Sequence, residues 1–107
     1  MSSRPIVQLI DLLGQKWVLR ILWELNQSPC NFRELQHRCG DISPTMINSR
    51  IKVLCEALLV SKSAEKGYSL SESGSEFITL FAPLNDFASQ WAADTNADTN
   101  KALRKSS

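Results

Sequence analysis

The stretch "ISPTMINSRIKVL", residues Ile42–Leu54, decides how the rest of the chain is interpreted. Ser43 is a favoured residue just before a helix, and Pro44 suits the first helical position, where its missing N–H is not needed. At about 100° per residue, the apolar side chains then fall on one face. That face comprises Ile47, Ile51, Leu54, Cys55 and Leu58. The stretch therefore predicts an amphipathic helix over residues 43–58.

The opposite face of this predicted helix is polar. The residues on it are Thr45, Ser49, Lys52 and Glu56, and Asn48 and Arg50 fall on its flanks. Composition alone leaves two interpretations open, an ordinary solvated face or a surface that contacts a partner. The neighbouring segments bear on this choice.

Three shorter helices are predicted before this stretch, over residues 6–13, 15–26 and 32–39. Apolar residues at helical spacing indicate the first two. Asn31, followed three residues later by Glu34, resembles a capping pair at the start of the third.

A β-hairpin is predicted after the stretch. Val60 and Lys62 alternate, as do Tyr68 and Leu70, around a tip at residues 64–67. Only five residues separate Lys62 from Tyr68, so we expect a short hairpin whose tip projects little.

A last helix is predicted from the segment "SESGSEF" onward. Its apolar stripe is Phe77, Phe81, Leu84, Ala88 and Trp91, and Pro83 should kink or split it. Apolar periodicity is lost after Trp91, where "ADTN" occurs twice. We therefore expect one domain over residues 1–92 and a polar, flexible tail over residues 93–107.

The predicted fold is mainly α with one small β-hairpin. The order of its elements is typical of a winged helix-turn-helix. In that arrangement the second helix of the pair presents its outer face to the major groove of DNA. Small polar side chains leave room in the groove, and cations reach phosphates or base edges. The predicted DNA-binding residues are Ser43, Pro44, Thr45, Met46, Asn48, Ser49, Arg50, Lys52, Lys62 and Lys66.

Composition and charge agree with a small DNA-binding domain. The chain has 107 residues, 43% hydrophobic and 21% charged, with a net charge of +1. Residues 14–70 hold eight Lys/Arg and five Asp/Glu, whereas residues 71–100 hold five acids and no base. The mildly basic middle suits a polyanionic partner. No apolar run suggests a membrane span or an export signal.

Neither catalysis nor a metal site is predicted. The chain has one histidine, His37, and three cysteines without the close spacing of a zinc site. No convergent set of acid, base and nucleophile is recognisable, and no cofactor is expected. The three cysteines cannot all pair within the chain, which fits a reducing cytoplasm.

Several motifs, in order, resemble the HxlR-type winged helix-turn-helix regulators of the broader MarR-like group. "LLGQKW" is similar to the family's GxKW signature, "FRELQ" to its third helix, and "YSLSESG" to the start of its last helix. "ISPTMINSRIKVL" resembles its recognition helix, and Trp91 its closing tryptophan. Members are small bacterial or archaeal regulators that bind double-stranded DNA as homodimers.

The resemblance implies one DNA-reading helix per protomer and a dimer interface formed by the first and last helices. An inverted-repeat operator would follow from that symmetry. Arg4 stands where redox-sensing members carry a cysteine, so oxidation sensing by that route is not expected. Leu58 stands where a glycine is usual, so we expect the recognition helix to end differently from the family pattern.

A second class of function stays open, namely a winged-helix module that binds another protein and not DNA. The modest net charge permits it. Salt dependence separates the two classes, because binding through several phosphates weakens steeply as salt rises. Neither the operator nor a small-molecule effector can be named from these residues.

Overall fold

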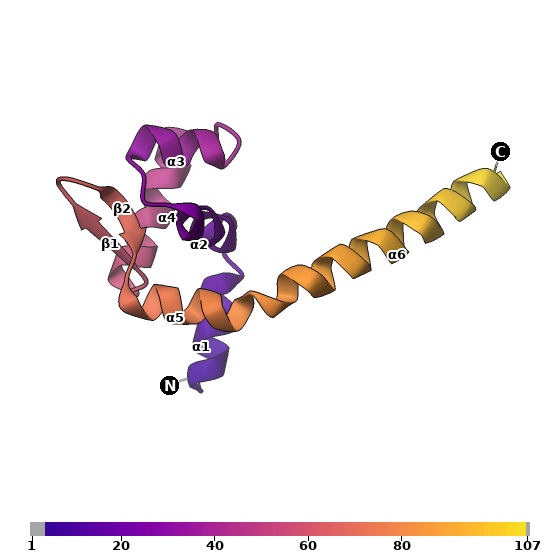
Figure 1. Cartoon of the computed structure of the whole chain (residues 1–107), viewed down its shortest axis with the longest axis horizontal. Helices are drawn as coiled ribbons and strands as arrows, with labels where there is room; N and C mark the ends of the chain where they lie inside the picture. Colours follow the sequence, from indigo (N-terminus) through magenta and orange to yellow (C-terminus); the bar gives the residue numbers. More distant parts are fainter. Residues whose placement is uncertain (1–3, 107) are drawn as a thin grey trace.

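A computed structural model describes residues 4–106, and in them four helices, a hairpin and two further helices follow one another (Figure 1). The elements are α1 (Pro5–Leu13), α2 (Val18–Gln27), α3 (Phe32–Arg38), α4 (Pro44–Glu56), β1 (Val60–Ser63), β2 (Gly67–Leu70), α5 (Glu72–Phe81) and α6 (Pro83–Ser106). The two strands are antiparallel. The predicted winged helix-turn-helix fold is confirmed.

Side-chain caps define where α3 and α4 begin. The Asn31 side chain accepts a hydrogen bond from the Glu34 N–H at 2.8 Å, and the Glu34 carboxylate accepts one from the Asn31 N–H at 3.3 Å. The Ser43 hydroxyl accepts from the Met46 N–H at 3.1 Å, and Pro44 is the first residue of α4. Such caps contribute about 1 kcal/mol each. Both predicted starts are confirmed.

The end of α4 differs from the prediction. The helix ends at Glu56, and Leu58 adopts a left-handed backbone with φ 62°. The Leu59 N–H donates to the Leu54 carbonyl and the Leu58 N–H to the Cys55 carbonyl, both at 3.0 Å, which is a Schellman motif. Leu58 therefore adopts the conformation usual for glycine, contrary to our expectation. Its side chain is 73% exposed and does not belong to the buried face.

The second helix starts later than predicted. The segment from Gly14 to Trp17 forms a turn, and Trp17 has φ 77°, a left-handed value that no helical residue adopts. α2 therefore begins at Val18. The Trp17 ring is half-buried and packs against the core.

The core is centred on α2, which contacts α1, α3, α4, α5 and β2. Four of its apolar side chains, one turn or less apart, are buried: Val18, Ile21, Leu22 and Leu25. Helices α3, α4 and α5 and the hairpin add further buried apolar side chains, namely Leu35, Ile47, Ile51, Leu54, Val60, Tyr68 and Ile78. The apolar face predicted for α4 is thus buried at residues 47, 51 and 54.

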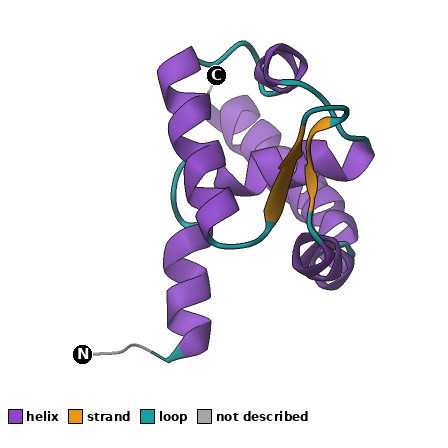
Figure 2. Ribbon diagram, turned by 90° about the vertical axis from the view of Figure 1, so that its left-hand side faces the viewer, coloured by secondary structure: helices purple, strands orange, loops and turns teal. Residues whose placement is uncertain are grey.

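The hairpin is anchored to the helices through Cys30. Val60 pairs with Leu70 and Lys62 with Tyr68. The Cys30 N–H donates to the Tyr68 carbonyl at 3.0 Å, and the Tyr68 N–H donates back at 2.8 Å. The strands run side by side (Figure 2), and at their turn they extend beyond the helices (Figure 1). This short hairpin is the predicted wing, with its turn at residues 64–66.

The last helical segment is split, as Pro83 predicted. α5 ends at Phe81, Ala82 separates the two helices, and Pro83 is the first residue of α6. α6 projects away from the rest of the molecule, on the side opposite the wing (Figure 1). The sequence predicted no regular structure after residue 92, but the helix continues, because no glycine or proline interrupts residues 84–106.

Candidate nucleic-acid interface

The predicted DNA-facing surface of α4 is largely accessible. Most of its predicted site residues are exposed: Ser43, Pro44, Thr45, Asn48, Ser49 and Lys52. Met46 and Arg50 are half-buried. Since the opposite side of the helix carries the buried residues of the core, α4 is held with its polar face outward. The folding of α4 therefore brings most of the predicted residues onto one surface.

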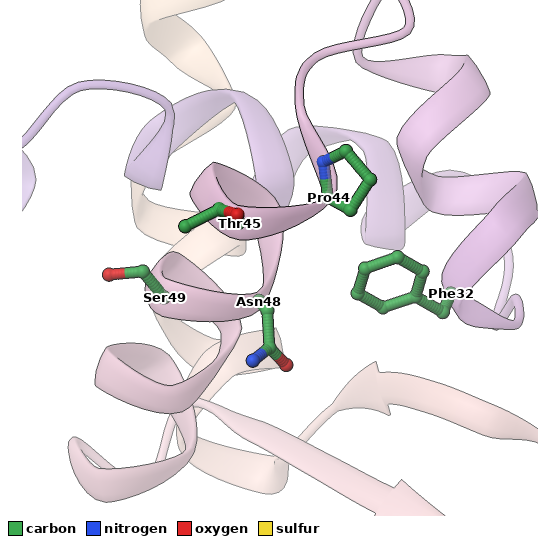
Figure 3. A pocket seen from close by; sticks show the side chains of 5 residues that line it. All are labelled: Phe32, Pro44, Thr45, Asn48 and Ser49. Carbon is green, nitrogen blue, oxygen red and sulfur yellow. The ribbon is translucent and has the colours of Figure 1, made fainter.

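A hollow of about 530 Å³ lies beside this face, between α4 and the start of α3. It is lined by Phe32, Pro44, Thr45, Asn48 and Ser49. Figure 3 shows the Phe32 ring opposite Pro44 and the Asn48 amide, with Ser49 further round α4. Phe32 was not among the predicted site residues. Its aromatic side chain, directly after the helix cap, was a signal, but an aromatic residue at a helix start is equally typical of a core.

Arg50 holds the turn before α2 against α4. Its Nε donates to the Lys16 carbonyl at 2.8 Å, and one Nη donates to the Ser49 hydroxyl at 3.3 Å. Arg50 was predicted as a DNA-contacting residue, and part of its guanidinium is used within the chain. The contact brings Lys16 beside α4, and its ammonium lies 5.6 Å from the centre of the Trp17 ring. Lys16 is exposed and adds a cation to this surface.

Two other arginines of the basic middle segment stabilise the fold. Arg20 pairs with Glu24 at 2.8 Å and donates to the Arg38 carbonyl at 2.8 Å. Arg38 donates to the carbonyl and the hydroxyl of Ser28 at 2.9 and 2.8 Å, just beyond α2. Within the described part of the chain, Arg33 and Lys52 are exposed and have no such partner. The basic excess is therefore only partly available for a polyanion.

The wing contributes two cations. Lys62 lies in β1 with its ammonium 5.8 Å from the centre of the Tyr68 ring. Lys66 is exposed in the turn, where its N–H donates to the Ser63 hydroxyl at 3.0 Å. β1 contacts α4, so the wing lies next to the recognition helix, although neither lysine lines the hollow.

The cysteines are protected thiols. Burial raises the pKa of Cys39 from 9.0 to about 11, and burial likewise raises the pKa of Cys30 and of Cys55. Cys30 and Cys39 are 2% and 1% exposed and belong to the core, whereas Cys55 is only half-buried. His37 is exposed and lies 3.2 Å from Asp41. In residues 4–106 no group of three His, Cys, Asp or Glu side chains is placed to hold a metal.

An apolar surface lies away from α4, on α1, α5 and α6. We use the name apolar surface for six exposed residues on these helices, namely Ile6, Ile10, Leu80, Leu84, Phe87 and Trp91. Beside it a cavity of about 330 Å³ is lined mainly by apolar side chains, among them Trp23, Phe81 and Phe87. Trp23 and Phe81 meet edge to face at 6.1 Å. Among the described helices, none is long and apolar enough to cross a membrane.

Solved structures of similar fold are transcriptional regulators. Quinone-bound YodB from B. subtilis aligns at 26% identity over 83% of this chain and 99% of its own, with a TM-score of 0.73. A possible HxlR family transcriptional factor from Thermoplasma volcanium GSS1 aligns at 26% identity, covering 86% and 88% of the two chains, with a TM-score of 0.73. A MarR-family protein from Porphyromonas gingivalis W83 shares the fold at 22% identity, over 82% and 94% of the chains, with a TM-score of 0.66.

No curated protein matches the chain at a significant level. The family comparison, in contrast, covers most of the domain. The family described as HxlR-like helix-turn-helix matches residues 12–96, which include the turn before α2, the helix-turn-helix, the wing and the first half of α6. The chain belongs to the HxlR-like helix-turn-helix family of transcriptional regulators.

Proposed function

We propose that the protein is a sequence-specific regulator that binds double-stranded DNA as a cytoplasmic homodimer, with α4 as its recognition helix. The exposed polar face of α4 carries this proposal. Its outward side chains are short, so the helix backbone can approach base edges in the major groove. The hollow beside α4 opens onto the same face.

Phosphate contacts would come from cations around α4. Lys52 and Arg33 are exposed, and Lys16 is held beside the helix by Arg50. Lys62 and Lys66 on the wing would meet phosphates that flank the site. Such contacts fix the position of the protein on the duplex without reading sequence.

The apolar surface supports a homodimer. Phe87 and Trp91 are 63% and 59% exposed, and α6 projects away from the other described elements (Figure 1). An isolated helix gains little stability in water, so most helices are stabilised by tertiary packing. A second copy would bury α1 and α6. Two-fold symmetry then calls for inverted half-sites about 34–36 Å apart, or a multiple of that spacing.

The test of DNA binding is selection of bound sequences from random duplex DNA by the purified full-length protein. We expect an inverted repeat and an affinity that falls steeply as salt rises. Selection that enriches no sequence, or binding that does not respond to salt, would contradict the proposal. A salt-independent protein partner would instead favour the protein-binding module.

Variants of α4 test which helix reads the DNA. Arg50→Ala should weaken binding by roughly 1–3 kcal/mol and Lys52→Ala by less, because Lys52 would contact only phosphate. Glu56→Ala is a matched control, since Glu56 is exposed near the end of the same helix and its removal takes away a negative charge. Unchanged affinity in both basic-residue variants, with folding intact, would exclude α4 as the reading helix.

A variant on α6 tests the dimer. Phe87→Glu should shift sedimentation from dimer to monomer at micromolar concentration, because it places a charge in the apolar surface. Ser89→Glu is the control, on an exposed position of the same helix. Wild-type protein that sediments as a monomer would contradict the homodimer. We further propose that residues 93–107 form a polar tail that is dispensable for DNA binding, which truncation after Ala92 tests.

A further inference from the structure

The hollow beside α4 combines an apolar wall with one amide. Phe32 and Pro44 supply two rings, and the Asn48 amide lies opposite the Phe32 ring (Figure 3). The Phe32 ring is half-buried and packs against the core, so it is held in place from behind. Within the described residues the Asn48 amide has no hydrogen-bond partner, although it is exposed and oriented beside these rings. It is therefore free to donate and accept with a ligand.

The charge of the hollow argues against a phosphate as its ligand. None of the five lining residues is a cation. The Arg50 guanidinium, directly after Ser49, is half-buried and donates to the Lys16 carbonyl and the Ser49 hydroxyl. Arg33, next to Phe32, and Lys52, one turn after Asn48, are the nearest exposed cations along the chain on either side. A duplex bound here would place its phosphates against the cations at the edges of the hollow. Its bases would then face the uncharged hollow between those cations. The hollow thus suits the edge of a base pair.

The A·T pair is the base pair whose major-groove edge matches these side chains. Adenine offers an acceptor at N7 and a donor at N6, which one carboxamide can satisfy together. Thymine offers the C5-methyl group, which prefers apolar contact. G·C pairs have no methyl group, and their purine offers two acceptors, which a carboxamide cannot satisfy with one donor and one acceptor.

Resting on the proposed function, we propose that this hollow is a thymine-methyl site: it takes the C5-methyl group of a thymine between Phe32 and Pro44, while Asn48 binds an adjacent adenine. Each half-site then contains A·T pairs where the first two turns of α4 meet the groove. Phe32, although it lies on α3, becomes a specificity-determining residue. The hollow is large enough for the edge of a base pair and not only for one methyl group.

The experiment replaces thymines by deoxyuridine, one position at a time, in a duplex selected by the full-length protein. This change removes only the methyl group and keeps base pairing. We expect one thymine in each half-site at which affinity falls about fourfold, the effect of losing burial of one methyl-sized group. At other positions the affinity for the thymine duplex divided by the affinity for the deoxyuridine duplex should stay near one.

Protein variants assign the effect to the hollow. Phe32→Leu should bring the thymine-to-deoxyuridine ratio towards one, and Pro44→Ala, at an exposed position, should do the same if Phe32→Leu fails to fold. Asn48→Ala should lower affinity for the selected duplex about tenfold or more and relax the preference for adenine. Lys52→Ala is the matched control. It should weaken binding to the thymine and the deoxyuridine duplex equally and leave the thymine-to-deoxyuridine ratio unchanged.

The outcomes separate the two proposals. Equal affinity for thymine and deoxyuridine at every position, in a duplex that is bound specifically, overturns the thymine-methyl site and leaves the proposed function standing. A ratio that persists in Phe32→Leu and in Pro44→Ala also overturns it, because the methyl group would then be read elsewhere. If no duplex is selected at all, the proposed function fails and this inference fails with it.

Discussion

Replacing Leu58 by glycine should stabilise the protein, although it removes a large apolar side chain. Leu58 has φ 62° and is 73% exposed. A left-handed backbone costs a non-glycine residue roughly 1–2 kcal/mol. Against this, glycine lacks the side chain whose buried quarter contributes roughly 0.5 kcal/mol to stability. Glycine also raises the conformational entropy of the unfolded chain, which lowers the stability by about 0.4–1 kcal/mol. The net expectation is about 0.3 kcal/mol of added stability, or a Tm higher by roughly 1–2 °C.

The control is glycine at the preceding residue. Ala57 has φ −80°, which any residue adopts, so Ala57→Gly brings only the entropic cost and should destabilise by about 0.5–1 kcal/mol. Thermal unfolding of both variants, at one fixed protein concentration, therefore gives shifts of opposite sign. The same hydrogen bonds from Leu58 and Leu59 are available to both, since they use only the backbone. A Tm that falls in Leu58→Gly as it does in Ala57→Gly would refute the reasoning.

Three further predictions follow from the wing and the interior. Gly67→Ala should destabilise by roughly 2 kcal/mol or more, because φ is 78° and an added Cβ would lie 2.5 Å from the Cys30 carbonyl oxygen; an unchanged Tm would contradict it. The folded-state pKa of Cys39 is raised from 9.0 to about 11, so its contribution to stability is complete below pH 9 and is lost as pH rises towards 11. Denaturant titrations over this range should show a weaker pH dependence in Cys39→Ala than in the wild type. Replacing Lys62 and Lys66 by alanine should reduce the salt slope of DNA binding by up to about two per protomer, and a change in base preference would show that the wing reads sequence.

Local signals predicted the start of the helix-turn-helix well. Ser43, Pro44 and the Asn31–Glu34 pair act within three residues along the chain, so their effect does not depend on the rest of the fold. The wing was predictable for the same reason, because strand alternation and a short turn are also local. Pro83 likewise separates α5 from α6 by its own chemistry.

The boundaries that were wrong depend on backbone conformations that residue type does not indicate. Trp17 and Leu58 have φ of 77° and 62°, values that sequence reasoning assigns to glycine or asparagine. Each residue stands at a turn beside a helix, and so α2 begins and α4 ends two or three residues away from the apolar pattern. In α6 the error had the opposite origin. Residues 93–106 lack an apolar stripe, but a stripe reports burial against the domain, and this part of α6 projects away from it.

The role of Arg50 shows why the candidate site could be only partly predicted. Its place on the flank of α4 indicates an outward cation, and that much is local. Its hydrogen bond to the Lys16 carbonyl joins residues 34 positions apart, which no periodicity reveals. A guanidinium has five N–H donors in one plane, and two N–H groups of Arg50 are used on Lys16 and Ser49. The remaining donors have no partner within residues 4–106 and can still meet a phosphate. Arg50 can therefore hold the turn before α2 and contact DNA together, whereas a lysine, with its donors on one nitrogen, could not bridge the two in this way.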